Sequence, residues 1–314
     1  MTAANYTPPP LALVVPAGLA GMRLDQALAQ LLPQHSRNRL KAWIDAGEVT
    51  VDGAPRAPRH RLAGGETLAI VAPPAVADDA HAAESIALTI VYEDDALIVV
   101  DKPAGLVVHP GAGNRAGTLL NALLHHAPAL AAVPRAGIVH RLDKDTSGLL
   151  VVARTMEAQT ALQRALAARS VKREYLAIAY GDIERAMTID APIARHPSAR
   201  TTMAVVASGR VARTHVEPRE RYTIATLVKC TLDTGRTHQI RVHMSAVRHP
   251  LVGDTVYGTP RRIPGLPPMG RQALHAWRLA LLHPESGKPM RWQSEPPADF
   301  AALREALRAR DAWA

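Results

Sequence analysis

The sequence contains one cysteine and few aromatic residues. Because Cys230 is the only cysteine among 314 residues, the chain cannot form an internal disulfide. Aromatic residues make up 4% of the chain, which argues against extended stacking on single-stranded nucleic acid. Neither a paired-cysteine motif nor a His-Glu-x-x-His motif is present, so we expect no metal and no cofactor. The longest apolar run near the N-terminus, Leu11 to Val15, is too short for a signal sequence or a membrane span, which predicts a cytosolic protein without a membrane partner.

Positive charge exceeds negative charge. The 37 lysines and arginines outnumber the 28 aspartates and glutamates, giving a formal net charge of +9. A polyanion such as a nucleic acid is therefore the expected partner, although solvated surface charge produces the same balance. With 47% hydrophobic residues the chain can bury a substantial core, and its length suggests one large domain and one smaller one.

A small basic module is predicted between residues 18 and 72. Apolar residues from Leu24 to Leu32 recur at helical spacing, and Pro33 ends this helix. A second helix begins after the N-cap residue Ser36 and ends at Gly47. Its buried stripe consists of Leu40, Trp43 and Ile44. The basic residues off that stripe, which either contact a nucleic acid or form a solvated face, are Arg37, Arg39 and Lys41.

The rest of the chain predicts a linker and an α+β core. Residues 73–87 are rich in Ala, Pro and Asp without an apolar period, which is typical of a flexible linker. Residues 88–314 alternate strand-like runs, such as Ala96–Val100, with helical stretches, such as Thr118–His125, and favour an α+β fold. Cys230 lies in an alternating strand and is expected to point into the core.

The most reactive segment is the polar run from His140 to Gly148. It lies between two apolar stretches, Gly137–Val139 and Leu149–Ala153, which are predicted to be short buried strands. The run is therefore expected to form a rigid loop at the end of a sheet. Its two carboxylates, Asp143 and Asp145, cannot be ranked by spacing alone. Either one needs a nearby cation to stay ionised beside a phosphate-rich substrate.

Motifs in the basic module and in the α+β core each resemble a known protein family. The basic module carries Arg23-Leu24-Asp25 at its first helix, Ser36-Arg37 at its second and Gly47-x-Val49-x-Val51-Asp52-Gly53 after them. Over about fifty residues this pattern resembles the S-four family of RNA-binding domains, which implies that the basic helix contacts RNA phosphates without reading sequence. The run His140-Arg141-Leu142-Asp143-x-x-Thr146-Ser147-Gly148 resembles the signature of RluA-type pseudouridine synthases. Further motifs of that family stand in order along the chain. Val100-Asp101-Lys102-Pro103-Ala104-Gly105 precedes this run, and the motifs that follow it are Arg173-Glu174-Tyr175, Thr234-Gly235-Arg236-Thr237-His238-Gln239-Ile240-Arg241-Val242-His243, His249-Pro250-x-Val252-Gly253-Asp254 and Tyr257-Gly258. The resemblance implies a catalytic core on a mixed, mainly antiparallel sheet, which converts uridine to pseudouridine in RNA.

The resemblance also implies roles for single residues. It selects Asp143 as the catalytic carboxylate and leaves Asp145 to stabilise the loop. It pairs the catalytic aspartate with a motif arginine, for which Arg236 is the expected residue, with a phosphate contact as the alternative. Since the target nucleotide must leave the RNA stack, Arg141 is implied to enter the gap and Tyr175 to pack against the uracil. A buried tyrosine on a strand is otherwise more often a core residue.

The substrate and the partners are inferred with less detail. The arrangement resembles family members that act on large-subunit ribosomal RNA, which implies uridines of the helix 69 stem-loop, although a related branch shares the layout. The expected partner is ribosomal RNA or a large-subunit assembly intermediate, and the enzyme is expected to bind it as a monomer. Arg195 and Arg200 either make further contacts with RNA phosphates or are solvated charges on loops. A non-catalytic RNA-binding assembly factor is a second hypothesis. A carbohydrate hydrolase ranks last, because two carboxylates in one loop are poorly placed to flank a sugar bond.

Overall fold

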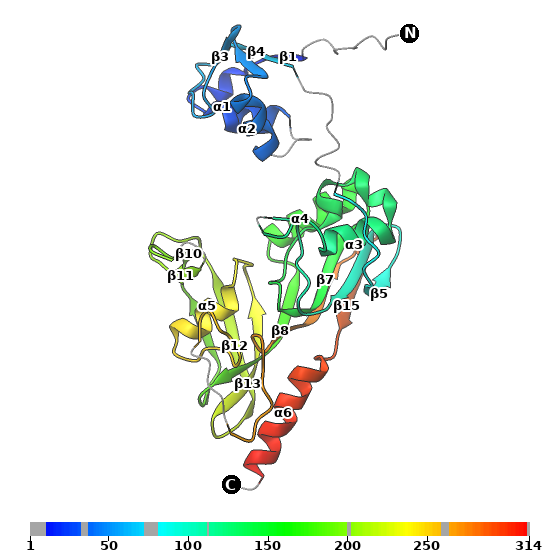
Figure 1. Cartoon of the computed structure of the whole chain (residues 1–314), viewed down its shortest axis with the longest axis vertical. Helices are drawn as coiled ribbons and strands as arrows, with labels where there is room; N and C mark the ends of the chain where they lie inside the picture. The colour runs from blue at the N-terminus through cyan, green and yellow to red at the C-terminus, as the bar shows by residue number, and fades with distance from the viewer. Residues whose placement is uncertain are drawn as a thin grey trace. The chain divides into compact units, whose positions relative to one another are not determined.

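The chain divides into two compact units, which we call unit 1 (Met1–Ala80) and unit 2 (His81–Ala314). The structure is a computed structural model that describes residues 11–32, 37–71, 81–111, 113–199, 202–258 and 264–312. Figure 1 shows the elements of both units. Within the described ranges, no helix is long and apolar enough to cross a membrane.

Unit 1 packs two helices against a small antiparallel sheet. The helices are α1 (Leu24–Leu31) and α2 (Arg37–Asp45). The strands, in the order β1-β4-β2-β3, are β1 (Leu11–Val14), β4 (Thr67–Ile70), β2 (Val49–Val51) and β3 (Ala54–Pro55). The predicted stripe of α2 is confirmed, since Leu40, Trp43 and Ile44 are all buried. Strand β1 lies before the expected boundary at residue 18. It nevertheless belongs to the sheet of unit 1, since it pairs along its whole length with β4. The predicted cap Ser36 and Pro33 lie outside the described residues.

The predicted linker contains a segment that is attached to unit 2. Residues 73–80 lie outside the described part of the chain, but the following residues form hydrogen bonds at the start of a helix, α3 (Leu119–His126). The Asn121 side chain donates to the Ala82 carbonyl at 2.7 Å, and the Glu84 N–H donates to the Asn121 carbonyl at 3.0 Å. Residues 82–84 are therefore held by the core rather than forming a free tether.

Unit 2 is built on a large mixed sheet, and the predicted α+β class is confirmed. Over the described residues this sheet has nine strands in the order β5-β6-β7-β14-β8-β13-β12-β9, with β15 paired to β14. All neighbouring pairs are antiparallel except β7 and β14. The strands are β5 (Thr89–Glu93), β6 (Leu97–Lys102), β7 (Ser147–Ala153), β8 (Lys172–Tyr180), β9 (Met187–Asp190), β12 (Arg213–Arg221), β13 (Ala225–Leu232), β14 (Leu274–Leu282) and β15 (Pro289–Gln293). A separate hairpin pairs β10 (Ile193–Arg195) with β11 (Met203–Val205).

Helices cover both faces of this sheet. Helices α3 and α5 (Gln239–Ala246) contribute to the same buried cluster as the face of β7 that carries Leu150 and Val152. On the opposite face, α4 (Met156–Ala167) packs with Leu149 and Val151, and α6 (Ala298–Asp311) packs over β8 and β14. Because both faces are covered, every residue of β7 is buried.

The segment before the polar run is not the strand that the sequence predicts. Pro134–Gly137 forms a tight turn in which Arg135, Ala136 and Gly137 have positive φ values, and only Ile138 forms a β-bridge, to Val152. Gly137 has a φ of +75°, and a Cβ there would lie 1.8 Å from the Ala153 carbonyl oxygen. Close backbone approach to β7 therefore requires glycine at this position.

Candidate active site

The polar run is a loop that leads into β7 on the face covered by α3 and α5. Lys102, the last residue of β6, is buried beneath it. Its Nζ donates to the carbonyls of Pro103 at 2.7 Å, Leu106 at 2.9 Å and Lys144 at 2.9 Å. Burial lowers the pKa of Lys102 to about 8, although the charges of Asp145 and Asp143 oppose the shift. The buried ammonium thus fastens the loop to the preceding motif.

Side chains from the start of β14 hold the other end of the loop. Arg271 donates to the Asp145 carbonyl at 3.0 Å, and the Gln272 amide donates to the Thr146 hydroxyl at 3.1 Å. The Ser147 hydroxyl lies 3.0 Å from Nδ1 of His275, which is itself buried. Anchors on both sides give the rigid loop that the sequence predicts.

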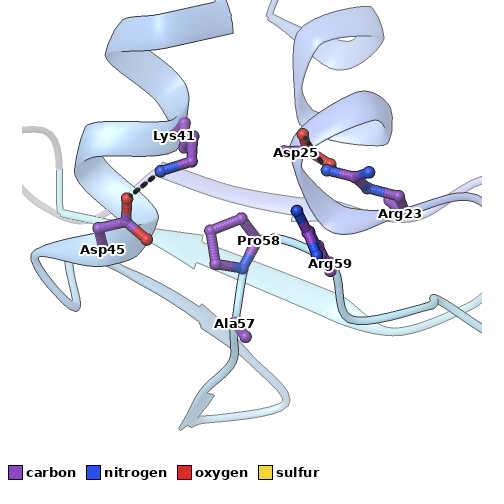
Figure 2. A pocket seen from close by; sticks show the side chains of 7 residues that line it. All are labelled: Arg23, Asp25, Lys41, Asp45, Ala57, Pro58 and Arg59. Atoms are coloured by element: carbon purple, nitrogen blue, oxygen red, sulfur yellow. Dashed lines mark hydrogen bonds and ion pairs between the residues drawn. The ribbon is translucent and has the colours of Figure 1, made fainter. Parts of the chain in front are cut away.

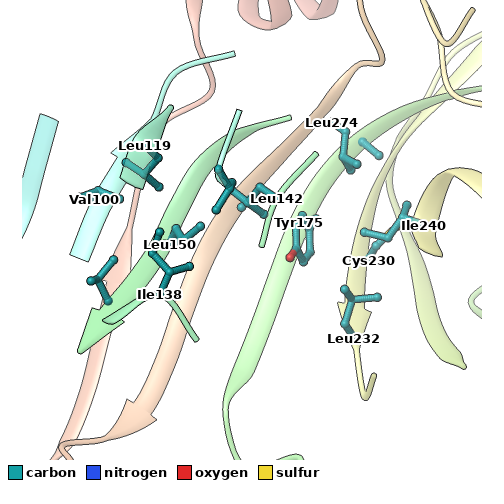
Figure 3. Packing of buried hydrophobic residues seen from close by; sticks show 14 of the residues in the cluster. Val100, Leu119, Ile138, Leu142, Leu150, Tyr175, Cys230, Leu232, Ile240 and Leu274 are labelled. Carbon is teal, nitrogen blue, oxygen red and sulfur yellow. The ribbon is translucent and has the colours of Figure 1, made fainter. Parts of the chain in front are cut away.

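The loop places Asp143 against an arginine of α5. Nη1 of Arg241 donates to Oδ2 of Asp143 at 3.1 Å, and the Asp143 side chain keeps 15% of its surface exposed. Leu142 and Ile240, the residues that precede the two partners, lie in one buried cluster with Tyr175 (Figure 3). Packing of these neighbours brings the carboxylate and the guanidinium together from positions 98 residues apart.

Arg241 is held by a second, buried carboxylate. Its Nε donates to Oδ2 of Asp254 at 2.7 Å and its Nη2 donates to Oδ1 at 3.0 Å. Burial opposes the charge on Arg241, but the hydrogen bonds and charges of Asp254 and Asp143 outweigh it and raise the pKa of Arg241. Burial likewise opposes the charge on Asp254, and Arg241 outweighs it to lower the pKa of Asp254. A bidentate pair of this kind fixes the guanidinium plane, so that one Nη remains for Asp143.

The expected pairing of Arg236 with Asp143 is wrong. Nε of Arg236 donates to the Val211 carbonyl at 3.0 Å, and burial together with the charges of Arg210 and Arg169 lowers its pKa. Arg236 precedes α5 in a turn, whereas Arg241 lies in the first turns of the helix on its buried side. The side chain that reaches the loop is therefore the later arginine of the same motif.

A histidine and a tyrosine complete the surroundings of Asp143. Nε2 of His238 lies 3.9 Å from Oδ1 of Asp143, and Nδ1 of His238 lies 2.7 Å from the Tyr257 hydroxyl. The Tyr257 hydroxyl accepts the Met203 N–H at 2.8 Å, so the hydroxyl can donate its own hydrogen to Nδ1 of His238. Because Nδ1 is then an acceptor, Nε2 carries the ring proton. Burial lowers the pKa of His238, which favours this neutral form, although the charge of Asp143 opposes the shift.

The remaining predicted site residues lie at different depths. Tyr175 is 6% exposed on β8, and burial raises the pKa of its hydroxyl, with the charge of Asp143 adding to the effect. Arg141 is exposed. His140 accepts the Val151 N–H at 3.1 Å, and burial together with the charge of Arg173 lowers its pKa to about 3. Cys230 is buried in the core as predicted, and burial raises the pKa of its thiol to about 12.

The predicted RNA contacts are only partly described. Lys41 forms an ion pair with Asp45 at 2.6 Å, and Arg195 is exposed on β10. The side chains of Arg37 and Arg39, and the whole of Arg200, lie outside the described atoms. Unit 1 contains a cavity of 580 Å³, shown in Figure 2. It is lined by Arg23, Asp25, Lys41, Asp45, Ala57, Pro58 and Arg59.

Sequence reasoning missed Arg241, Asp254, His238 and Tyr257. Arg241 and His238 were inside the motif that was singled out, and the helical register was the available signal, since Ile240 and Met244 mark the buried side of α5. Asp254 closes the last motif of the family resemblance and Tyr257 follows it, but no helical register marks either residue, because both reach the site through a turn that only the fold determines. Among the described residues, no group of three or more His, Cys, Asp or Glu side chains could hold a metal ion.

Comparison with known proteins agrees with this arrangement. A family model described as RNA pseudouridylate synthase matches residues 96–246, and a model of the S4 domain matches residues 22–68. The ribosomal large subunit pseudouridine synthase D of Nitrosomonas europaea is 57% identical over 94% of this chain and 87% of its own length. The protein of the same name from Pseudomonas aeruginosa is 54% identical over 94% of each chain. The solved structure of human RNA pseudouridylate synthase domain containing 1 is 28% identical, with a TM-score of 0.55 over 72% of this chain and 96% of that chain. The chain therefore belongs to the RluA-type family of RNA pseudouridine synthases and is an enzyme that isomerises uridine to pseudouridine.

Proposed function

We propose that this enzyme modifies uridines of large-subunit ribosomal RNA, in the helix 69 stem-loop, and that Asp143 is its catalytic carboxylate. The substrate is supported by relatives that carry the name large subunit pseudouridine synthase D and are more than 50% identical over 94% of the chain. The catalytic role is supported by the pair of Asp143 with Arg241. That contact is the single observation on which the assignment of the residue depends.

The reaction needs little besides an ionised carboxylate in a fixed position. The carbon–nitrogen glycosidic bond breaks, the uracil turns, and a carbon–carbon bond forms at C5 as C5 loses a proton and N1 gains one, without any redox change. The carboxylate acts on the sugar, acts on the base or removes a sugar proton, and each of these steps requires the anion. Arg241 supplies the positive charge beside Asp143, while Asp254 holds Arg241 so that its position does not depend on substrate.

A uridine inside structured RNA has to be turned out of its stack before Asp143 can reach it. We assign Arg141 to the vacated position, because its side chain is exposed two residues before Asp143. We assign Tyr175 to the uracil, because it packs in the buried cluster that contains Leu142, the residue before Asp143. Arg37, Arg39, Lys41, Arg195, Arg200 and Arg236 are assigned to RNA phosphates.

Exchange of Asp143 for asparagine tests the catalytic assignment. We expect Asp143→Asn to lower turnover of a helix 69 transcript by at least about 10³-fold, because the amide keeps the shape and loses the charge. Binding of the same RNA should be retained. Turnover is measured by pseudouridine mapping and affinity by equilibrium titration.

The same variant separates this function from a non-catalytic one. A deletion strain complemented with Asp143→Asn should lack pseudouridine in the helix 69 stem-loop, whereas complementation with the wild-type gene should restore it. Restoration by the variant would contradict the role of Asp143. Loss of pseudouridine elsewhere in large-subunit RNA, with helix 69 unaffected, would replace the proposed site by another in the same RNA.

A further inference from the structure

Arg173 has a buried side chain without a counterion. The residue is 7% exposed at the start of β8. Its Nε is buried without a hydrogen-bond partner. Among the described residues, no hydrogen bond and no ion pair involves its guanidinium. Arg241 and Arg271, the arginines that hold the catalytic loop and Asp143, differ in this respect, since each binds a carboxylate.

The guanidinium lies beside the active site. Arg173 precedes Tyr175 by two residues on β8, so both side chains are on the same face of the sheet. Its positive charge acts on both His140 and Tyr175, and Tyr175 is also influenced by Asp143. Arg173 therefore lies near the residues that flank and face the catalytic loop.

The loop before α5 leaves room for this side chain. A Cβ on Gly235 would lie 2.6 Å from Nη1 of Arg173 and 3.7 Å from its Cζ. The guanidinium thus occupies the space that any side chain at position 235 would fill. Gly235 directly precedes Arg236, so the guanidinium lies against the backbone of the turn that leads into α5.

Such an arrangement is costly in the free protein. The buried Nε–H loses hydration and gains no compensating hydrogen bond, and arginine cannot escape the cost by losing its proton. The substrate offers the missing charge, because RNA carries one phosphate per nucleotide. A guanidinium binds phosphate through parallel N–H donors.

We propose that Arg173 binds a backbone phosphate of the RNA substrate, next to the nucleotide that enters the active site. The proposal rests on the proposed function only in its choice of RNA. It places an anion subsite between the Arg173 strand and the Gly235 turn. Binding of substrate then provides the counterion that the free enzyme lacks.

Two substitutions in the full-length protein test the subsite. Arg173→Met removes the charge, and Gly235→Ala displaces the guanidinium while leaving the net charge unchanged. The probe is a transcript of large-subunit ribosomal RNA that contains helix 69, titrated from 50 to 200 mM salt. We expect each variant to bind about tenfold more weakly at low salt, and the slope of log affinity against log salt to fall by about 0.7 to 0.9, the effect of one lost phosphate contact. The rise in KM should exceed the fall in kcat.

Matched controls separate a phosphate contact from general charge or folding effects. Arg291→Met removes an exposed arginine of β15, and Gly270→Ala adds a Cβ that meets no atom within 4 Å. Both should bind like wild type. Urea unfolding of the free protein should show Arg173→Met to be at least as stable as wild type, because the unpaired buried charge is gone. A purely structural arginine would give the opposite result.

Several results would overturn the proposal. One such result is that both variants bind RNA with the affinity and the salt dependence of wild type. Another is a lower kcat with an unchanged salt dependence of binding, which would mean that Arg173 contacts the base. If the wild-type enzyme leaves this RNA unmodified, the proposed substrate is wrong. The binding comparison still tests the subsite in that case, since a phosphate contact does not depend on sequence.

Discussion

Arg241 serves two carboxylates, and its replacement should affect both the reaction and the fold. We expect Arg241→Gln to lower kcat by about 10²- to 10³-fold, because Asp143 loses its cation. It should also destabilise the protein by about 3 to 5 kcal/mol, because Asp254 is left buried and unpaired. Single-turnover assays and urea unfolding measure the two effects.

Arg236→Gln is the matched control for that experiment. It removes the same charge five residues earlier in the motif, where the side chain donates a hydrogen bond to the Val211 carbonyl and, among described groups, pairs with no carboxylate. We expect a stability change within about 0.5 kcal/mol and an effect on KM rather than kcat. A larger loss of kcat in Arg236→Gln than in Arg241→Gln would restore the sequence-based pairing.

Tyr257→Phe tests whether the hydroxyl orients His238. The variant keeps the ring over which the Arg241 guanidinium lies, 5.0 Å from the centroid, and removes the partner of Nδ1. We expect kcat to fall about 10- to 100-fold with little change in KM, because the ring proton no longer has a fixed position. His238→Gln, which keeps a donor near the Nε2 position, should retain more activity than His238→Asn. Equal activity of these two histidine variants would exclude a donor role for Nε2.

Residue roles were predictable where local sequence determines them. Cys230 was predicted to be a core residue because strand alternation alone sets its direction. Asp143 was selected by a resemblance, since loop spacing does not distinguish it from Asp145. Its partner was missed because only the helical register distinguishes the two arginines of one motif. That register depends on where the helix begins, and helix boundaries are the weakest part of such predictions.

At the scale of elements, Glu220 ties helix α6 to strand β12. Its carboxylate accepts hydrogen bonds from Arg304, Arg308 and Tyr222. Burial opposes the charge, but these bonds outweigh it and lower the pKa of Glu220 from 4.5 to about 2. A carboxylate with a lowered pKa stabilises the fold above its usual pKa, and this contribution is lost as the pH falls toward 2.

We therefore expect Glu220→Gln to lower the free energy of unfolding by about 1 to 2 kcal/mol at pH 7. The difference from wild type should shrink between pH 4.5 and 2, because wild type then loses the same charge. Urea titrations at several pH values measure it, with Glu285→Gln, an exposed loop residue, as the control. A difference that does not vary with pH would rule out the charge as its source.

Elements with strong local signals were predicted closely. Helix α3 extends over Leu119–His126 after the Thr118 cap, close to the predicted stretch Thr118–His125. Strand β1 was missed because its apolar run is short. Gly137–Val139 was mistaken for a strand because a short apolar run without periodicity does not identify a strand. Strand order in the sheet depends on contacts between distant segments, which no local pattern encodes.

At the scale of the whole molecule, the net charge of +9 predicts RNA binding that is sensitive to salt. Replacing Arg37, Arg39 and Lys41 by glutamine should weaken binding of the helix 69 transcript and reduce the salt slope by about 2 to 3 if each contacts a phosphate. The kcat at saturating RNA should change far less, because Asp143 and Arg241 both belong to unit 2. Unchanged affinity and slope would assign these residues to a solvated face.

The position of β14 in the sheet has a consequence for synthesis. Strands β7 and β8 follow one another along the chain with only α4 between them, yet β14 lies between them in the sheet. A ribosome making this protein therefore releases two apolar strand edges long before the strand that joins them. Direct pairing of those edges would seal the gap and trap the nascent chain in a misfolded form. Chaperones that shield exposed edges during translation should thus matter more for this protein than for one whose central strands are made in order.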